Sequence, residues 1–400
     1  MKFLRNIFDR KNDVDQIISK ICKNKKIKKK SDIFLYFDWP FGSYIFDELL
    51  KEKTNLQLDK FSLFEIFDVH DRRDLMVLYE QDLQTYCQTI CNFIVEHYPD
   101  GIQGFLITHD WLPAHQVVVK IFQKLGVQTV LITHEGVFQN RNLFYDSKAP
   151  ICDIALVWGR LHKEIFIERG YSSEKIFEVG SIKLNKMKNF SFNVDKDKFF
   201  SITNLHADKK TILYCCQLCD LQWGCQENAL NHQKKQIEDI VMLCNENEYN
   251  CIIRNSPALP MRVLPDDFVS YLSKYDNVFI DGYDLDNTAK SQYKVSIEDS
   301  LFYSDLVIGM NTTVQLEAVL IHKPAIIMQY FDFDAVWGRV LGLPIAKSKK
   351  DLALLVQHLI NVDRFNIDQD LREHFEISYG YSDNPDFSPI DNIYNILRSV

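Results

Sequence analysis

The chain has 400 residues, of which 46% are hydrophobic and 13% aromatic, and its formal net charge at pH 7 is -9. A chain of this length and composition can bury a large core, and its length favours two domains over one. The net negative charge argues against a general nucleic-acid binder, because neutralising many phosphates requires a basic face. We therefore expect a soluble globular protein without a nucleic-acid partner.

The first 30 residues form an amphipathic and basic leader. Apolar residues recur at roughly helical spacing between residues 3 and 21, and seven lysines with no acid among them lie between residues 20 and 30. An amphipathic helix followed by a lysine run can hold a protein on an anionic membrane surface, each lysine contributing about 1 kcal/mol. A solvated surface helix and linker explain the same pattern.

The N-terminus lacks the continuous apolar core of a secretory signal, and the sequence has no run of about 18 uncharged apolar residues that could cross a bilayer. We expect a cytoplasmic protein, which the leader could place peripherally on the inner face of the cytoplasmic membrane. The ten cysteines fit this expectation. Several lie in apolar segments and are expected to be reduced core residues, among them Cys87, Cys91, Cys244 and Cys251.

Hydrophobic runs alternate with helical periodicity between residues 31 and 190. Short apolar runs that end in turn residues predict strands at 32–37, 105–108, 127–133, 154–158 and 176–180. Apolar residues at helical spacing predict helices at 74–97, 113–125 and 162–169, and Gly126 and Gly170 stop the last two. Short strands joined by helices in this order predict a parallel sheet with right-handed crossovers.

A second alternating series follows residues 189–210, where the apolar rhythm weakens and charge rises. It predicts strands at 211–215, 249–254, 278–280, 305–309 and 325–329, and helices at 228–245, 297–303 and 313–321. The expected fold class is α/β, with two Rossmann-like domains facing a cleft. We place the first domain at 31–190 and the second at 205–375, with 376–400 as a tail or a helix that packs back.

Polar residues follow the carboxyl ends of these strands, where open parallel sheets bind their ligands. They are His109 and Asp110 after the strand at 105–108, His134 and Glu135 after 127–133, Gln217 and Asp220 after 211–215, and Arg254 at the end of 249–254. Exposed loop acids are the alternative interpretation of Glu135 and Asp220. A helix N-cap explains Asp110 as well as a site role does.

Residues 304–329 carry the most informative pattern. The strand ends at Gly309, the turn contains Asn311 and Thr312, and a helix opens at Thr313. Hydroxyls and free backbone N–H groups converge there at the positive end of the helix dipole, which predicts a phosphate site. Glu317 lies one turn later, where it could accept hydrogen bonds from a ribose. The alternatives are a plain cap for the threonines and a solvated or structurally paired acid for Glu317.

This segment resembles the donor-nucleotide motif of glycosyltransferases with the GT-B fold, in which a pattern like S-D-x-x-I-x-x-x-[ST]-[ST]-x-x-x-E-A precedes a K-P turn. The matching residues are Ser304, Asp305, Ile308, Thr312, Thr313, Glu317, Ala318, Lys323 and Pro324. A second resemblance is to the end of the first domain in bacterial surface-polysaccharide transferases and CDP-glycerol glycerophosphotransferases. It rests on Val157-Trp158-Gly159, His162-Lys163, Gly170-Tyr171 and Val179-Gly180-Ser181.

The architecture is similar to that of retaining β-Kdo transferases of capsule and lipopolysaccharide synthesis, which use CMP-Kdo. The resemblance implies a metal-independent glycosyltransferase without a cofactor, which takes its sugar from a nucleotide-sugar donor and moves it onto a bacterial surface glycan or glycolipid acceptor. It implies donor binding in the second domain by Gln217, Arg254, Asn311, Thr312, Thr313 and Glu317. It implies acceptor binding in the first domain by His109 and Asp110, with Asp220 as nucleophile, Glu135 as acid/base and His134 beside it in catalysis.

One turn departs from the pattern of these families. Many relatives have a histidine in an R-P-H-P-like turn where this chain has Arg254-Asn255-Ser256-Pro257. No histidine role is expected there, while Arg254 can still neutralise a phosphate or a sugar carboxylate. A CDP-glycerol-type glycerophosphotransferase, a sugar-nucleotide 2-epimerase and a non-catalytic glycan-binding protein remain alternative functions.

The sequence contains little that indicates a metal site. Cys215, Cys216, Cys219 and Cys225 include one CxxC but no second ligand pair, so zinc is not expected. The chain has neither a GxxxxGK[ST] loop nor a GxGxxG fingerprint, and Asp284-Leu285-Asp286 matches a DxD pattern only in a loop of the second domain. We therefore expect no metal.

Overall fold

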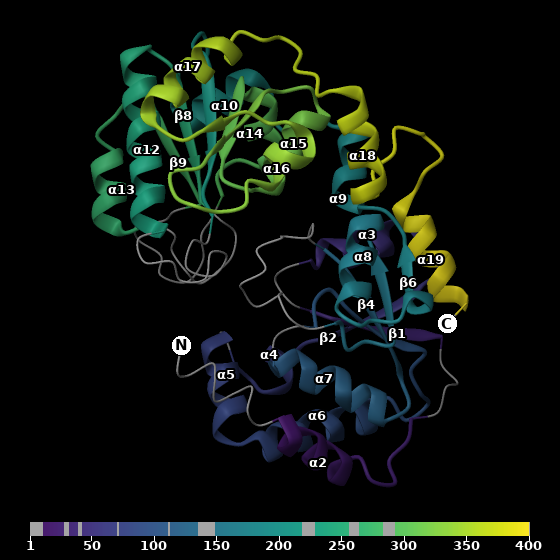
Figure 1. The fold of residues 1–400 in the computed structure, drawn as a ribbon. Helices are drawn as coiled ribbons and strands as arrows, with labels where there is room; N and C mark the ends of the chain where they lie inside the picture. Colours follow the sequence, from purple (N-terminus) through teal and green to yellow (C-terminus); the bar gives the residue numbers. More distant parts are fainter. Residues whose placement is uncertain are drawn as a thin grey trace. The chain divides into compact units, whose positions relative to one another are not determined.

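The computed structural model describes residues 11–27, 32–38, 42–69, 72–110, 113–134, 149–217, 229–255, 264–282 and 293–399. These residues form two compact units (Figure 1). The first unit contains the described residues up to 182 and those from 377 onward, and the second contains residues 183–376. Among the described residues, no helix is long and apolar enough to cross a membrane.

The first unit is built on a six-stranded parallel sheet with the strand order β2-β1-β3-β4-β5-β6. Its strands are β1 (Ile33–Phe37), β2 (Gln57–Phe61), β3 (Gly104–Ile107), β4 (Gln128–Ile132), β5 (Ile154–Val157) and β6 (Ile176–Glu178). Consecutive residues of a strand point to opposite faces, so Phe105 and Ile107 pack into one core and Leu106 into another. Both faces are therefore buried, as a parallel sheet requires.

Helices cover both faces of this sheet. The helices are α2 (Lys11–Ile21), α3 (Tyr44–Glu52), α4 (Leu63–Ile66), α5 (Arg72–Gln81), α6 (Leu83–His97), α7 (Pro113–Lys124), α8 (Arg160–Glu168) and α19 (Pro389–Ser399), with a 3-10 turn at Ser173–Lys175. The chain passes into the second unit at α9 (Ile182–Asn185), and a 3-10 turn at Lys186–Asn189 follows there. Residues of α2, α6 and α7 fill the core on one face, and residues of α3 and α19 fill the core on the other.

The first unit differs from the sequence predictions at the helix expected over 74–97 and over residues 44–66, where α3, β2 and α4 were not predicted. The single helix predicted at 74–97 is two helices, because the side chain of Asp82 caps α6 by accepting the Thr85 N–H at 3.0 Å and the Thr85 hydroxyl at 2.6 Å. Strand β2 was not predicted. It lies at the edge of the sheet and only its last residue, Phe61, is fully buried, so it lacks the apolar run that marks the other strands.

Helix α2 uses its apolar face within the first unit. Val14, Ile18 and the following Cys22 are buried against α6 and α7, and Lys120 of α7 bonds to Asp15 at 2.6 Å. Burial of these side chains accounts for the amphipathic pattern over the described part of the leader. Membrane binding by the leader stays a prediction.

The second unit is a six-stranded parallel sheet with the order β12-β11-β10-β7-β8-β9. Its strands are β7 (Thr211–Cys215), β8 (Asn250–Arg254), β9 (Val278–Asp281), β10 (Leu306–Gly309), β11 (Ala325–Met328) and β12 (Ile345–Ala346). Its helices are α10 (Lys196–Thr203), α12 (Ala229–Glu246), α13 (Asp266–Leu272), α14 (Ile297–Tyr303), α15 (Thr313–Leu320), α16 (Val336–Leu341) and α17 (Lys349–Leu359), and α18 (Gln369–Tyr379) begins in it. Figure 1 shows α12 and α13 on one side of this sheet and α14 and α15 on the other.

The predicted α/β class with two Rossmann-like units is confirmed, and each predicted strand is present within two residues of its expected ends. Residues 189–210, where the apolar pattern of the sequence weakens, contain α10, whose Phe199 and Phe200 are buried. The last helix, α19, packs Ile390, Ile393 and Leu397 into a core of the first unit.

Candidate functional site

The strand order of the second unit defines where a ligand would bind. The first and fourth strands in chain order, β7 and β10, are neighbours, and the direction of winding reverses between them. Doubly wound sheets bind ligands at the carboxyl ends of the strands at such a switch point. Gln217 lies just beyond β7, and Asn311 lies just beyond β10. Several of the predicted donor-binding residues are therefore brought together there.

Gln217 joins the segments that leave the two strands. Its side-chain Oε1 accepts the backbone N–H of Asn311 at 2.8 Å, and its own backbone bonds to Gln233 of α12. The Asn311 amide donates to the Asp334 carbonyl at 2.6 Å. Its Oδ1 is buried and has no hydrogen-bond partner among the described residues. Gln217 thus supports the loop, and Asn311 Oδ1 is an acceptor that a bound ligand could satisfy.

The two threonines at the start of α15 differ in their bonding. Thr312 is the N-cap: its hydroxyl accepts the Val314 N–H at 3.3 Å, and its backbone N–H donates to the Gln315 side chain at 3.0 Å. This capping box matches the alternative that the sequence left open for the pair. Thr313 differs, because its hydroxyl accepts a hydrogen bond from Lys183 at 2.9 Å.

Lys183 is a cation at the positive end of α15. Its Nζ also lies 2.7 Å from Oε1 of Glu317, whose side chain is 2% exposed. The Glu317 carboxylate compensates the charge of Lys183, which explains how a cation is kept beside a helix N-terminus. Sequence analysis missed Lys183, since it lies 130 residues before Thr313. The available signal was Glu317 itself, an acid within a helix of mostly apolar residues that requires a partner when buried.

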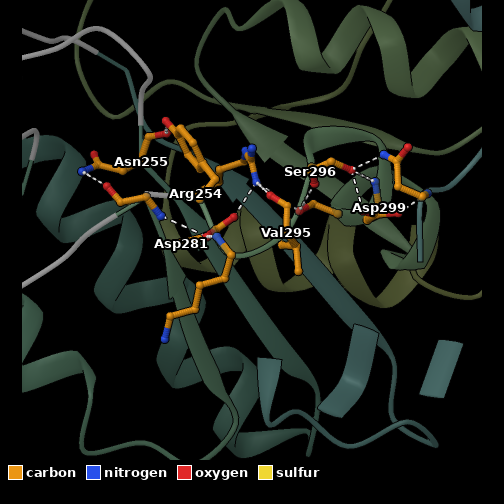
Figure 2. Close-up of polar contacts among 11 residues, drawn as sticks. Arg254, Asn255, Asp281, Val295, Ser296 and Asp299 are labelled. Atoms are coloured by element: carbon orange, nitrogen blue, oxygen red, sulfur yellow. Dashed lines mark hydrogen bonds and ion pairs between the residues drawn. The ribbon is translucent and has the colours of Figure 1, made fainter. Parts of the chain in front are cut away.

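Arg254 is held inside the second unit by several groups (Figure 2). Its guanidinium lies 2.5 Å from Asp281 and donates to the Val295 carbonyl at 3.0 Å, and it stacks on the Tyr293 ring at 4.2 Å from the centroid. Burial raises the pKa of Asp281, and the charge of Arg254 opposes that shift. The described contacts of Arg254 are thus structural, and its predicted role toward the donor stays a prediction.

A second acid, Asp299, fixes the segment that precedes α10. It accepts the backbone N–H groups of Asn193 at 2.6 Å and Val194 at 3.2 Å, and Figure 2 shows Ser296 beside it. Burial alone would raise the pKa of Asp299, but hydrogen bonds from Ser296 and from these two residues lower it below the ordinary value. Asp299 therefore anchors the segment of the second unit that leads into α10.

The switch point of the first unit, between β1 and β3, gathers buried histidines. His109 and His134 follow β3 and β4, and their rings lie 5.3 Å apart. His134 Nδ1 bonds to the Thr108 carbonyl at 3.2 Å, and the Tyr44 hydroxyl donates to the His134 carbonyl at 3.0 Å. Gly42 has φ +85°, and a Cβ there would meet the Cβ atoms of Thr108 and His134 at 2.8 and 2.9 Å. Only glycine fits this approach.

His115 completes this group and was missed in the sequence. It lies on α7, fully buried, with its ring 4.7 Å from that of His109 and its Nδ1 bonded to the His109 carbonyl at 3.2 Å. As the third residue of a predicted amphipathic helix, His115 suggested only a core residue.

Asp110 lies three residues before α7 and accepts the backbone N–H groups of Ile151 at 2.6 Å and Cys152 at 3.1 Å. Burial raises the pKa of Asp110, although these hydrogen bonds oppose the shift. The carboxylate therefore fixes the segment before β5. Its predicted role toward an acceptor stays a prediction.

No protein-family model matches the chain, and no curated protein matches its sequence. Among solved structures, the UDP-GlcNAc 2-epimerase of Methanocaldococcus jannaschii, in complex with UDP-GlcNAc and UDP, is similar with a TM-score of 0.58 and 15% identity, covering 92% of this chain and 99% of that chain. The wall teichoic acid polymerase TagF has a TM-score of 0.54 and 14% identity, covering 100% and 96%. Anabaena HepE, in complex with UDP-glucose, has a TM-score of 0.53 and 13% identity, covering 92% and 100%. The chain has the GT-B fold.

Several predictions made for this GT-B chain lie outside the described residues. They concern Glu135, Asp220, the Ser256-Pro257 turn, Asp284-Leu285-Asp286, and Cys219 with Cys225. Within the described ranges, no group of three or more His, Cys, Asp or Glu side chains is arranged to hold a metal ion. The cysteines predicted to be reduced core residues, Cys87, Cys91, Cys244 and Cys251, are buried free thiols.

Proposed function

We propose that this protein transfers a glycosyl group from a nucleotide-sugar donor whose phosphates bind at the start of α15. The observation that carries the proposal is Lys183 Nζ at 2.9 Å from the Thr313 hydroxyl, beside the switch point of a doubly wound sheet. A cation, a hydroxyl and the positive end of a helix dipole form a place that favours a phosphate.

The bonding around α15 indicates which groups would hold the phosphates. The backbone N–H groups of Asn311, Thr312 and Val314 are already bonded to side chains. Lys183 and Thr313 would therefore supply most of the contacts, and they would stabilise the negative charge that develops on the leaving nucleotide. The buried Asn311 Oδ1 would accept a hydroxyl of the donor.

The donor that we propose is CMP-Kdo, with a bacterial surface glycan or glycolipid as acceptor. The sequence resemblance to β-Kdo transferases supports this choice, and the GT-B neighbours bound to UDP-sugars support a nucleotide sugar more generally. In this proposal His109 and Asp110 bind the acceptor. Asp220 is the nucleophile and Glu135 the acid/base, and His134 acts beside Glu135 in catalysis. The reaction uses neither a metal nor a further cofactor, and takes place in the cytoplasm or at the inner face of its membrane.

A sugar-nucleotide 2-epimerase is the second candidate. The similarity to the M. jannaschii epimerase supports it, because the match covers 99% of that chain. Epimerisation would use the same phosphate site and would require no acceptor. The similarity to a teichoic acid polymerase supports glycerophosphotransfer as a third candidate. This reaction would transfer glycerol phosphate and not a sugar.

A donor panel tests these alternatives. Purified protein is incubated separately with CMP-Kdo, CDP-glycerol and UDP-GlcNAc, together with a lipopolysaccharide or capsule oligosaccharide, and free nucleotide and products are measured by mass spectrometry. Transfer predicts release of CMP with an enlarged oligosaccharide. Epimerisation predicts an interconverted sugar without release. Product from neither route, with no nucleotide bound by calorimetry, would refute the proposed function.

The catalytic assignment has its own variant. Asp220→Ala is expected to abolish transfer and to leave donor binding unchanged, because the nucleophile contacts the reacting carbon and not the phosphates. Asp208→Ala removes an exposed acid of the same unit and serves as the matched control. Full turnover by Asp220→Ala would remove this residue from the mechanism.

A further inference from the structure

Two buried thiols of the first unit are in contact. Cys22, which follows α2, and Cys91, in the middle of α6, have their sulfur atoms 3.7 Å apart, although 69 residues separate them in the chain. Cys22 is 6% exposed and Cys91 fully buried. A disulfide bond is about 2.05 Å long, so the sulfurs would have to approach by about 1.7 Å.

A lysine lies beside this pair. Lys25 Nζ is 3.9 Å from the Cys91 sulfur and 3.1 Å from the Asn92 amide oxygen, which holds the ammonium in place. The hydrogen bond from Cys22 lowers the pKa of Cys91 to about 7, and the charge of Lys25 assists while burial opposes the shift. The contact with Cys91 and burial raise the pKa of Cys22. Because the Lys25 ammonium contacts the Cys91 sulfur, Cys91 is the thiolate of the pair, and the thiolate is the reactive form.

We propose that Cys22 and Cys91 form a reversible thiol–disulfide site that hydrogen peroxide oxidises. The Cys91 thiolate attacks one peroxide oxygen, which breaks the O–O bond and gives a sulfenic acid and, after proton uptake, water. The Cys22 sulfur then attacks the Cys91 sulfur, the S–O bond breaks, the S–S bond forms and a second water leaves. Both sulfurs are oxidised by one electron and the peroxide is reduced to two waters.

Three other buried cysteines, Cys87, Cys244 and Cys251, lack this arrangement. Cys87 is one turn before Cys91 on α6, and burial raises its pKa to about 12. Cys244 and Cys251 of the second unit are also buried near each other, but burial, as the largest effect, raises the pKa of Cys244 with no cation to oppose it. They are expected to stay as thiols, so they serve as internal controls.

Oxidation would fasten α2 to α6. The helix is held to α6 and α7 in the reduced protein by the burial of Val14 and Ile18 and by the Lys120–Asp15 pair. The covalent link would add a constraint at the end of α2 that none of these contacts supplies. Under oxidising conditions the disulfide would therefore keep α2 attached to the first unit.

The test uses the full-length protein, treated with hydrogen peroxide at neutral pH without denaturant. Free thiols are then alkylated in denaturant and peptides are identified by mass spectrometry. We expect a Cys22–Cys91 linked peptide that reducing agent removes, with Cys87, Cys244 and Cys251 alkylated. The proposal would be overturned if Cys244 and Cys251 are oxidised to the same extent. It would also be overturned if Cys91 is recovered in its alkylated form, because it would then have escaped oxidation.

Variants separate the two steps. Cys22→Ser is expected to leave Cys91 as a sulfenic acid that a dimedone-type probe labels, and Cys87→Ser is expected to form the linked peptide as the wild type does. Lys25→Met is expected to slow the first step at least fivefold at neutral pH and less at high pH, because the cation acts by stabilising the thiolate. An unchanged rate in Lys25→Met would refute the part assigned to the lysine. The wild-type measurement stands even if one variant does not fold.

Discussion

Replacing Lys183 by methionine is the sharpest test of the donor site, because Lys183 has two separable roles. Its ammonium lies 2.7 Å from the buried Glu317 carboxylate and 2.9 Å from the Thr313 hydroxyl. Methionine keeps most of the side-chain volume and removes the charge. The variant therefore loses both a partner for Glu317 and a contact for a bound phosphate.

The magnitudes follow from these two contacts. A hydrogen bond to a charged group contributes about 1.5–3 kcal/mol, so donor affinity is expected to fall by about 10-fold to 150-fold. The unpaired Glu317 carboxylate is expected to lower the free energy of unfolding by about 1–3 kcal/mol, since the partner that it loses is one-third exposed.

The double variant Lys183→Met/Glu317→Gln separates the two roles. It removes the stranded charge, so most of the lost stability is expected to return, whereas donor affinity is expected to stay low. Urea unfolding measures stability, and calorimetric titration with the nucleotide measures affinity. Lys163→Met is the control, because it breaks a surface pair with Glu178 at 3.3 Å. It is expected to change donor affinity by less than twofold and the free energy of unfolding by less than about 0.5 kcal/mol.

One result would refute this reasoning. If the double variant regains both stability and wild-type affinity for the nucleotide, Lys183 serves only Glu317. The phosphate site would then have to lie elsewhere.

Two further predictions concern a lysine and a glycine. Burial lowers the pKa of Lys323 to about 8 from its ordinary 10.5, so the unfolded chain binds one more proton between these values and stability rises with pH there. Between pH 7 and pH 10, the free energy of unfolding of the wild type is expected to rise by about 2 kcal/mol relative to that of Lys323→Met. A difference between the two proteins that does not change with pH in urea unfolding would contradict the assignment. Gly42→Ala is expected to cost at least about 2 kcal/mol and to shift the His134 imidazole resonances, because the added Cβ overlaps Thr108 and His134. Gly126→Ala is the control, because Gly126 has a nearly equal φ of +84° and an added Cβ there would meet nothing within 4 Å. It is expected to lower the free energy of unfolding by about 1 kcal/mol. Equal losses of stability in the two variants would show that the overlap at Gly42 is relieved.

The sequence was sufficient to predict the strand that ends at Gly309, the turn at Asn311 and the helix that opens at Thr313. A buried strand needs an uninterrupted apolar run, and a helix start needs a capping residue, so both are written locally. The edge strand β2 was not foreseen, since a strand with only one fully buried residue carries no such run. The division of 74–97 into two helices depended on one side-chain hydrogen bond, from Thr85 to Asp82.

Local pattern thus determined the α/β class, the two units and the loops on which polar residues would gather, because each of these follows from neighbours within about 20 residues. Strand order, and with it the switch point that joins Gln217 to Asn311, was decided only by tertiary structure. The same holds for the pairing of Lys183 with Glu317 and for the contact of Cys22 with Cys91. Such partners are 69 to 134 residues apart in the chain, and no local preference of either residue specifies which distant side chain it will meet when the sheet assembles.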